Sequence, residues 1–472
     1  MLEKSINSLI NLFKVKRNID LPKLFKNLTV RVLKFGGTSV GTPERMQQVA
    51  RIISKGDNFV VLSAVSGTTN SLVEVSNSIK NGKQEKYCKQ LNDLKLKYIP
   101  FVEELINDDI ILAQAHKYVN AQFEKLEDLC SRIWTTNLEA EILSYGEVLS
   151  TNLFSFYLNE IGVENLLVSA LDFMKINING EPDLNEIDNR LNNLVESENN
   201  VQVYVTQGFI CRDSDNNVSN LKRGGSDYSA SLIGEAINAE EIVIWTDIDG
   251  MHNNDPRVVN TTYSVKELSF NEAAELAYFG AKILHPQCVF PAQRAGIDMR
   301  IKNTMQPNAV GTRITEEVEC KGVKAIAAKD NITAIKIKSG RMLMAYGFLT
   351  KVFEIFERNE TSIDMITTSE VAVSLTIDDN SKLSEIKTEL ENLGEVEVDR
   401  EQSIVCVVGS FSAENKGYAS EIFNSIKEVP VRMVSYGGSK HNISILLDTS
   451  NKAKALNLLN EGLFNLNEVN YV

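Results

Sequence analysis

The sequence predicts an α/β fold with a parallel-rich sheet sandwiched by helices, followed by two α+β units. Three observations support this prediction. Strand-like and helix-like runs alternate from residue 30 to about residue 313, as expected of a parallel sheet covered on both faces. After about residue 316 the order changes to βαββαβ, and that pattern then recurs with one strand too few.

The first part is expected to contain strands at residues 30–35, 59–63, 201–208 and 241–246. Its helices are expected at residues 43–54, 137–161, 229–239 and 271–281. Thr42 suits the N-cap of the first helix, and Pro43 suits its first turn. Residues 76–136 are polar and helix-patterned, which predicts a helical excursion from the sheet.

The second part repeats its elements. The first α+β unit, at about residues 331–400, is expected to have strands at 333–339, 362–367, 371–377 and 395–399 and helices at 349–359 and 382–392. The second α+β unit, at about residues 401–472, is expected to have strands at 403–409, 431–435 and 442–447 and helices at 416–426 and 452–464. A strand at 322–327 would complete the second unit and place the first unit inside it.

The bulk properties exclude several classes of protein. A length of 472 residues suggests about three domains, and 43% hydrophobic content is ordinary for a globular core. The net charge of −14 argues against a nucleic-acid surface, and no apolar run is long enough to predict a membrane span. The six cysteines are scattered, so we expect reduced thiols, no bound metal and a cytoplasmic location.

Residues 1–29 form an extension in front of the first strand. Basic side chains alternate there with apolar ones, which indicates a short amphipathic helix. No long apolar core or small-residue cleavage site follows the charges, so a docking or frayed helix is favoured over a targeting signal.

Residues 32–40 (VLKFGGTSV) join the first strand to its helix through two glycines. Gly36 and Gly37 let the backbone approach an anion, and Ser39 adds a donor at the positive end of the helix. Lys34 supplies a point charge suited to a phosphate. Any α/β protein can connect a strand to a helix in this way, so the segment alone leaves function and structure equally open.

Two later segments place charges beside glycines. Residues 223–227 (RGGSD) combine an arginine, two glycines, a hydroxyl and a carboxylate in one turn, and clustered charge adds little to packing, so function is favoured. Residues 245–250 (WTDIDG) close a strand in acids, with Arg257 shortly after. Nucleotides dock at the carboxyl ends of such strands. Neither a Walker A motif nor G-x-G-x-x-G occurs.

Three further segments have competing structural interpretations. Residues 61–70 (VLSAVSGTTN) end a strand in hydroxyl side chains but would serve equally well as a turn. Glu147 shares a predicted helix face with Ser150 and Thr151, yet alone it is more often a solvated surface acid. Lys282, in residues 279–286 (FGAKILHP), would also complement the dipole at a helix C-terminus.

Together these segments resemble the aspartate kinases, a branch of the amino acid kinase superfamily, from about residue 30 to the C-terminus. The two α+β units are similar to the ACT regulatory domains of that family. The resemblance implies an amino acid kinase-like catalytic domain over residues 30–315 and a tandem ACT region over 316–472. It also implies a homodimer paired through the ACT units, or a tetramer.

The implied activity is ATP-dependent phosphorylation of the β-carboxylate of L-aspartate to 4-phospho-L-aspartate, the first step toward lysine, threonine and methionine. A carboxylate with a reference pKa of about 3.9 is already ionised at neutral pH, so charge neutralisation matters more than a general base. ATP is expected to bring Mg²⁺ with it, and no tightly bound cofactor is expected.

The resemblance also implies site residues. The implied catalytic residues are Lys34, Asp227 and Lys282. The implied aspartate-binding residues are Ser63, Thr69, Glu147, Arg223 and Ser226. The implied ATP-binding residues are Lys34, Gly36, Gly37, Ser39, Thr246, Asp247, His252, Arg257 and Lys282. His252 stands where the family usually has a tyrosine, so altered ATP affinity is expected.

Residues 342–349 (MLMAYGFL) and 362–370 (SIDMITTSE) resemble the effector site of lysine-sensitive aspartate kinases. The implied contacts are Met342, Phe348, Leu349, Ser362 and Asp364. An acid suits a cationic effector, so lysine is preferred to threonine. Asp364 is open to a second interpretation, as an exposed acid between strands, and Met344 and Ala345 replace more polar residues of the pattern.

Two other functions stay open. Another amino acid kinase, acting on glutamate or a nucleoside monophosphate, would share the glycine loops, although residues 223–227 and the paired α+β units argue against it. A catalytically inactive amino-acid sensor would use the ACT units alone. A fusion to homoserine dehydrogenase is not expected from the length.

Overall fold

The computed structural model describes residues 30–54, 56–197, 201–221, 224–280, 284–318, 322–340, 346–411 and 416–464. The chain divides into two compact bodies. Within the described residues, the first body comprises residues 30–33, Val40–Asn220 and Leu232–Glu241. The second body comprises Lys34–Ser39, Leu221–Ser231 and the residues from Ile242 onward.

The larger sheet has eight strands in the order β3-β4-β2-β1-β7-β9-β10-β8. β3 pairs with β4, β4 with β2, β7 with β9 and β10 with β8 in parallel, whereas β9 and β10 are antiparallel. The predicted parallel-rich sheet is confirmed. The bounds are β1 (Arg31–Phe35), β2 (Asn58–Leu62), β3 (Asn165–Val168), β4 (Val203–Gln207), β7 (Ile242–Thr246), β8 (Glu267–Ser269), β9 (Met299–Asn303) and β10 (Thr312–Thr315).

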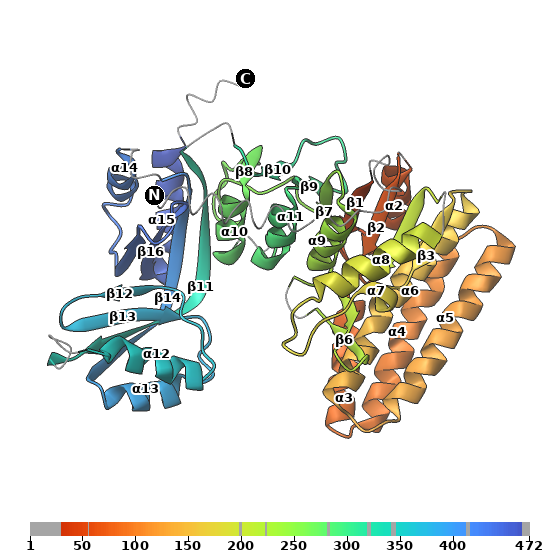
Figure 1. Cartoon of the computed structure of the whole chain (residues 1–472), viewed down its shortest axis with the longest axis horizontal. Coiled ribbons are helices and arrows are strands. Elements are labelled where there is room, and N and C mark those ends of the chain that lie inside the picture. The colour runs from red at the N-terminus through yellow and green to blue at the C-terminus, as the bar shows by residue number, and fades with distance from the viewer. Residues whose placement is uncertain are drawn as a thin grey trace, which may run out of the picture. The chain divides into compact units, whose positions relative to one another are not determined.

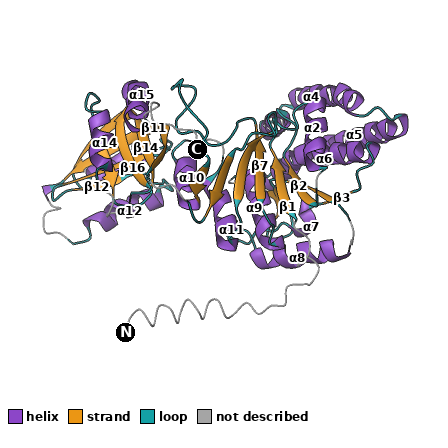
Figure 2. Cartoon of the chain, turned by 90° about the horizontal axis from the view of Figure 1, so that it is seen from above, coloured by secondary structure: helices purple, strands orange, loops and turns teal. Residues whose placement is uncertain are grey.

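Helices cover both faces of the strands in the first body. Figure 2 shows α2 and α6 on one face and α7 and α8 on the other. The predicted helical excursion is present as α3, α4 and α5, and α4, α5 and α6 lie side by side (Figure 1). The bounds are α2 (Pro43–Ile53), α3 (Thr68–Lys80), α4 (Gln84–Leu105), α5 (Asp109–Cys130), α6 (Thr136–Glu160), α7 (Ala170–Phe173) and α8 (Leu184–Ser197).

The start of α2 follows its sequence signals. The Thr42 side chain accepts a hydrogen bond from the amide of Arg45, and Pro43 occupies the first turn. The remaining elements of this region are the hairpin β5 (Ile210–Arg212) and β6 (Val218–Asn220), and α9 (Gly225–Ile237), α10 (Phe270–Tyr278), the short 3-10 turn η2 (Pro286–Cys288) and α11 (Val289–Ala295).

A second, antiparallel sheet follows in the order β12-β13-β11-β14-β16-β15. Its long central strands β11 and β14 lie side by side (Figure 1). The strands are β11 (Val323–Lys338), β12 (Ile366–Thr368), β13 (Ala372–Ile377), β14 (Glu395–Gly409), β15 (Met433–Tyr436) and β16 (Asn442–Asp448). The helices are α12 (Phe348–Arg358), α13 (Leu383–Glu391), α14 (Tyr418–Ser425) and α15 (Lys452–Leu463).

Two predicted strand breaks are wrong. The strands expected at 322–327 and 333–339 are halves of β11, and those expected at 395–399 and 403–409 are halves of β14. The register of the pairing between β11 and β14 shifts between Lys329 and Ile332. The turn-like residues Asp330 and Asn331 lie at this shift, and Asn331 has a φ of 61°. A β-bulge therefore replaces the turn, and the strand continues.

Each half of this sheet has its own apolar core. The core of the first α+β unit joins the C-terminal half of β11 to α12, α13 and β13, with Ile335 and Phe356 among its members. The core of the second α+β unit joins the N-terminal half of β11 to β14, β16, α14 and α15, with Ile326 and Val405 among its members. Within the described ranges, no helix combines the length and the apolar character needed to cross a membrane.

Candidate active site

Lys34 lies near the carboxyl end of β1 and forms a nearly buried ion pair. Its Nζ is 2.6 Å from Oδ1 of Asp227, which stands in the first turn of α9. The two side chains are only 11% and 16% exposed. Taking such a pair out of water is costly, and strongly placed charges of this kind are concentrated at functional sites. Two residues predicted from separate motifs are therefore brought into direct contact.

The turn that carries Asp227 requires glycine. Gly224 has a φ of 73° and Gly225 a φ of 45°, both in the left-handed region. A Cβ on Gly224 would lie 2.4 Å from Sγ of Cys288, so the turn packs directly on η2. Burial raises the pKa of the Cys288 thiol well above its ordinary value, and the charge of Asp227 adds to the shift. The thiol is therefore neutral packing for the turn.

The glycine turn after β1 is tied to the neighbouring strand. The amide of Gly36 donates to the carbonyl of Trp245 at 3.2 Å, and the amide of Ser39 donates to the carbonyl of Gly36 at 2.9 Å. Ser39 is 1% exposed, and its hydroxyl oxygen lies 2.7 Å from Oγ1 of Thr304. The hydroxyl thus fixes the turn, while Gly37 stays partly accessible in it.

The predicted nucleotide residues after β7 are held by local contacts. Thr246 donates to Oδ1 of the exposed Asp247 at 3.2 Å. His252 has Nε2 2.7 Å from Oδ1 of Asp249 and Nδ1 3.1 Å from Oγ1 of Thr262. Both ring nitrogens therefore have partners, and the imidazole is fixed in orientation.

Arg257 forms a bidentate salt bridge with Asp255. Its Nε and Nη2 donate to the two carboxylate oxygens at 2.9 and 2.8 Å. This hydrogen bonding lowers the pKa of Asp255, although partial burial acts in the opposite direction. The Arg257 side chain is 74% exposed, so its pairing can be exchanged for a ligand from solvent.

In the first body, Glu147 is buried rather than solvated. It is 4% exposed on α6, and its Oε1 accepts a hydrogen bond from the amide of Ala64 at 3.2 Å. A Cβ on Gly146 would lie 2.8 Å from Cβ of Ala64, so a glycine is what lets α6 reach the segment after β2. The interpretation of Glu147 as a surface acid is wrong, because its carboxyl group is buried at this strand end.

Hydroxyl side chains connect α6 to the same strand end. Ser150 donates to the carbonyl of Ser63 at 2.6 Å, and Thr151 accepts from Nε2 of Gln207 at 2.9 Å. Thr69 lies in the first turn of α3 and is partly accessible. The first body therefore brings Ser63 close to the helix turn that carries Glu147.

The remaining predicted site residues differ in what the structure describes. Ser226 is 8% exposed in the first turn of α9. Arg223, Lys282 and Met342 lie outside the described residues. Their assignments therefore stay predictions from the sequence.

The predicted effector residue Asp364 is the centre of a polar cluster that we call the polar link, formed by Tyr278, Lys329, Asp364 and Asp378. Oδ1 of Asp364 accepts from the Tyr278 hydroxyl at 2.6 Å and from Nζ of Lys329 at 2.8 Å, and Lys329 also reaches Asp378 at 2.8 Å. The Asp364 side chain is 1% exposed, so its interpretation as an exposed acid is wrong.

Charge dominates the polar link. Burial alone would lower the pKa of Lys329, but its hydrogen bonds to the two carboxylates raise it. Burial and the carboxylate of Asp364 both raise the pKa of Tyr278. Sequence reasoning missed Tyr278 and Lys329. Tyr278 is the last residue of α10 and directly precedes the 279–286 motif, which could have drawn attention to it. No motif near Lys329 in the sequence indicates a functional role.

The other predicted effector residues differ in burial. Phe348 is 9% exposed and belongs to the core of the first α+β unit, whereas Leu349 is 37% exposed. Ser362 is exposed just before Asp364. Phe348 therefore has a packing role in addition to any ligand contact.

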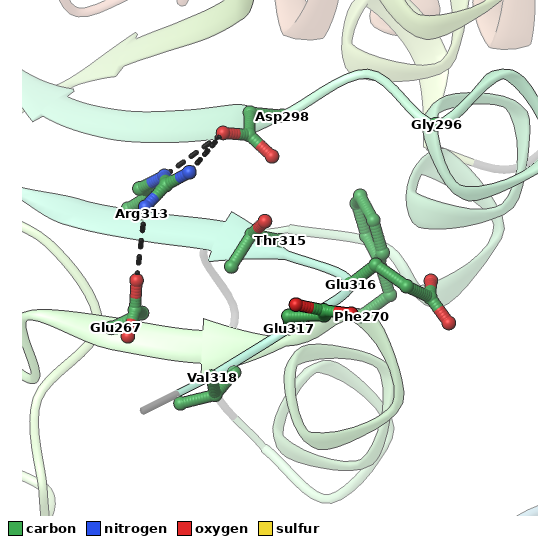
Figure 3. Close-up of a pocket in the computed structure, with 9 residues that line it drawn as sticks. All are labelled: Glu267, Phe270, Gly296, Asp298, Arg313, Thr315, Glu316, Glu317 and Val318. Carbon is green, nitrogen blue, oxygen red and sulfur yellow. Dashed lines mark hydrogen bonds and ion pairs between the residues drawn. The ribbon is translucent and has the colours of Figure 1, made fainter. Parts of the chain in front are cut away.

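A pocket of about 530 Å³ in the second body does not suit a nucleotide (Figure 3). Four carboxylates are among its lining residues, namely Glu267, Asp298, Glu316 and Glu317. Its cation, Arg313, is already paired with Glu267 and Asp298 at 3.1 and 2.6 Å. The excess of negative charge would repel a triphosphate. No group of three potential metal ligands occurs in the part of the chain that the structure describes.

Comparisons with known proteins identify the family. A profile of the amino acid kinase family matches residues 29–303, and an ACT domain profile matches residues 405–463. The lysine-sensitive aspartokinase 3 of Escherichia coli (strain K12) is 33% identical over 447 residues, which cover 92% of this chain and 99% of that protein. The chloroplastic aspartokinase 3 of Arabidopsis thaliana is 34% identical over 484 residues, covering 96% and 84%.

Solved structures agree. Aspartokinase III of E. coli in complex with aspartate and ADP (R-state) has a TM-score of 0.81 at 32% identity, covering 92% of this chain and 100% of that one. The same protein in complex with lysine and aspartate (T-state) has a TM-score of 0.75 at the same identity and coverage. The profile, the relatives and the structures together confirm the predicted family: this chain belongs to the aspartokinases, which are amino acid kinases that carry ACT domains.

Proposed function

We propose that this chain transfers the γ-phosphoryl group of ATP to the β-carboxylate of L-aspartate, giving ADP and 4-phospho-L-aspartate. The observation that carries the proposal is the nearly buried ion pair between Lys34 and Asp227, which holds a cation at the end of β1 beside a glycine turn. The E. coli relative whose structure contains aspartate and ADP supports the choice of both substrates.

The chemistry needs positioning and neutralisation of charge. The aspartate carboxylate attacks the γ-phosphorus, the bond from phosphorus to the β,γ-bridging oxygen breaks, and ADP leaves with that electron pair. Lys34 would neutralise the charge that develops on the phosphoryl oxygens, and Asp227 holds its ammonium at 2.6 Å. The turn amides of Gly37, Gly224 and Gly225 would act as further donors, whereas the amide of Gly36 is taken by the carbonyl of Trp245. Mg²⁺ supplies charge neutralisation when it arrives with ATP.

Recognition of aspartate would rest on opposite charges. Glu147 would hold the α-amino group, because its carboxylate is buried and fixed by Ala64. Arg223 would bind the α-carboxylate through its planar fork. Ser63, Thr69 and Ser226 would donate hydroxyl hydrogen bonds.

The adenosine and phosphates of ATP would meet the residues after β7. Thr246, Asp247 and His252 would line the nucleotide, and Lys282 would join Lys34 at the phosphates. Arg257 would exchange its pairing with Asp255 for a phosphate contact, which its 74% exposure permits. His252 is already held through both ring nitrogens and would contact the base through its ring face.

We also propose that lysine inhibits the enzyme through Asp364. Oδ2 of this buried carboxylate has no hydrogen-bond partner among the described residues, so it can accept a bond from an ammonium group. Met342, Phe348, Leu349 and Ser362 would complete the site. A relative named lysine-sensitive, and its structure in complex with lysine, favour lysine over threonine.

Aspartate-dependent release of ADP tests the activity. The chain is assayed with ATP and aspartate, with ATP and glutamate, and with ATP alone. Turnover with aspartate alone supports the proposal, turnover with glutamate alone indicates another amino acid kinase, and no turnover indicates an inactive sensor.

Two substitutions test the residue that carries the proposal. Lys34→Met is expected to lower kcat by about 10³-fold, because one fixed charge in a shielded site contributes several kcal/mol. Lys97→Met, at an exposed lysine of α4, removes the same charge elsewhere and should leave kcat unchanged. Equal activity of the Lys34→Met enzyme and the parent would refute the assignment.

Inhibition by lysine is tested with a matched pair of acids. Asp364→Asn should abolish inhibition by millimolar lysine, because the amide no longer attracts an ammonium group. Asp378→Asn removes a second carboxylate that also binds Lys329, and it should leave inhibition intact. Threonine is tested in parallel. Loss of inhibition in both variants, or in neither, would contradict the role of Asp364.

Assembly and location complete the proposal. We expect a homodimer paired through the α+β units, or a tetramer, and sedimentation analysis with and without lysine measures it. A cytoplasmic location is expected from the family and is tested by fractionation.

A further inference from the structure

The segment between β7 and β8 that carries His252 and Arg257, residues 249–264, is anchored outside the catalytic sheet. Its apolar anchor is Val259, which is 2% exposed and belongs to the core of the second α+β unit together with Val405, Ile422 and Leu459. The adjacent Val258 packs against the same core. A loop of the catalytic region thus supplies part of the hydrophobic core of the second α+β unit.

A buried amide network adds a polar anchor. Asn460, on α15, is 2% exposed, and its Oδ1 accepts from Nδ2 of Asn253 at 3.2 Å and from Nδ2 of Asn254 at 3.3 Å. Its Nδ2 donates to Oγ1 of Thr261 at 3.2 Å. The side chain of Asn460 therefore holds together residues from the beginning and from the end of the loop.

The two loop asparagines hold the backbone in turn. Oδ1 of Asn253 accepts from the amide of Tyr263 at 2.8 Å, and the carbonyl of Asn253 accepts from the amide of Ile326 in β11. Nδ2 of Asn254 also donates to the carbonyl of Leu456 in α15 at 3.1 Å. Asn253 is fully buried and Asn254 is 3% exposed, so each lost partner would leave a polar group without water to replace it.

The aromatic end of the loop reaches the same helix. Tyr263 packs edge-to-face on Phe464, just after α15, with ring centroids 6.0 Å apart. Arg257 lies between these anchors, and His252 directly precedes the first of them, Asn253. The geometry of the predicted nucleotide residues is thus set by α15 and β11 as much as by the catalytic sheet.

We infer that Asn460 is a positioning residue for the nucleotide, and that the second α+β unit is a built-in part of the ATP-binding half of the enzyme. This inference rests on the proposed function in one respect, namely that ATP binds beside His252 and Arg257. Asn460 acts through Asn253, Asn254 and Thr261 and does not itself touch the ligand. The effect of α15 on ATP is therefore present without any effector.

The test compares two asparagines on one helix, in the full chain. Asn460→Ala removes the network, whereas Asn457→Ala, three residues earlier, removes an amide whose partner among the described residues is the carbonyl of Ala453 within α15. For each variant, KM for ATP, KM for aspartate, kcat, and binding of ADP by calorimetry are measured.

Asn460→Ala is expected to raise KM for ATP and the Kd for ADP by roughly tenfold, the cost of releasing buried amides, while KM for aspartate stays within about twofold. Asn457→Ala is expected to match the parent in all four quantities. The rise of KM for ATP alone separates positioning of the nucleotide from a general loss of folded enzyme, which would lower the apparent kcat and leave both KM values unchanged.

Two further variants guard against misfolding of Asn460→Ala. Thr261→Val removes only one acceptor of Asn460, and Val259→Ala loosens only the apolar anchor, so each should raise KM for ATP with a smaller change. Unchanged KM for ATP in Asn460→Ala, or a rise of both KM values together, overturns the inference. A parent that lacks aspartate-dependent activity but binds ADP, with weaker binding in Asn460→Ala, overturns the proposed substrate and upholds the inference.

Discussion

The two α+β units share one sheet but are attached to the catalytic region in different ways. The second unit takes Val259 of the 249–264 loop into its own apolar core. The first unit has a core made of its own residues within the described part of the chain, and it meets α10 through the hydroxyl of Tyr278 and the carboxylate of Asp364. The first of these attachments combines a shared apolar core with a buried amide network, and the second is a polar contact.

Because of this difference, we expect the two α+β units to have different roles although they share a fold. Separating the second unit would expose buried apolar surface and break the Asn460 network, so the second unit is fixed to the 249–264 loop. Separating the first unit breaks a few charged hydrogen bonds, which water and an incoming ammonium group can replace. Effector control is therefore expected to act through the first unit, and ATP positioning through the second.

The largest expected effect is at the apolar attachment. Val259→Asp places a charge in a dry core and should lower the free energy of unfolding by about 3–5 kcal/mol. Val371→Asp places the same charge on a half-exposed valine of the first unit and should change it by less than about 0.5 kcal/mol. Urea unfolding followed by circular dichroism measures both. Similar losses in the two variants would contradict the comparison.

The next effect is at the polar link. Lys329→Met leaves the 1% exposed carboxylate of Asp364 with only the Tyr278 hydroxyl, and the free energy of unfolding should fall by about 2–3 kcal/mol. KM for ATP should stay unchanged, because the 249–264 loop is held by the other unit. Lys336→Met, at an exposed lysine of the same strand, is the control. A raised KM for ATP in Lys329→Met alone would mean that the two attachments are coupled.

A smaller effect is expected at the tyrosine of the polar link. Tyr278→Phe removes one hydrogen bond to Asp364 and should cost about 1 kcal/mol, because Lys329 still holds the carboxylate. Inhibition by lysine should persist, since Asp364 keeps its charge. Dose-response curves for lysine measure this. Complete loss of inhibition would show that Tyr278, rather than Asp364, transmits the effector.

The sequence predicted the elements of these regions well, because periodicity and caps are local. It failed where a distant partner decides the outcome. Residues 330–331 look like a turn, yet pairing of β11 with β14 across a bulge keeps the strand continuous. Glu147 looks like a surface acid, yet Gly146 lets α6 reach Ala64 and bury it.

Within the candidate site, too, some residues carried a signal in the sequence and others did not. The contact of Lys34 with Asp227 joins two motifs that the sequence had singled out separately. Asn460 had no such signal, because an asparagine on a helix is ordinary until its partners are known. Val258 and Val259 did carry a sequence signal, because two adjacent valines between the polar residues of 252–257 and 260–262 predict an apolar surface that covers them.

The smallest expected effect is on the pH dependence of stability, and it has opposite signs in the two units. In the 249–264 loop that the second unit holds, the Arg257 pair lowers the pKa of Asp255, and at the second unit itself Lys452 and Ser403 lower the pKa of Asp330 despite its burial. A lowered folded-state pKa gives stability that is present above the unfolded value of about 3.8 and is lost as the pH falls through the folded value.

The polar link of the first unit behaves in the reverse way. The pKa of Lys329 is raised above its ordinary 10.5, so its stabilisation is complete below that value and is lost as the pH rises through the folded-state pKa. Urea unfolding at several pH values compares the parent with Lys452→Met and Lys329→Met. The deficit of Lys452→Met should shrink below about pH 4, and that of Lys329→Met only above about pH 10.5. If the deficit of Lys329→Met shrinks in the acid range instead, the prediction is wrong, and the two attachments do not differ in their response to pH.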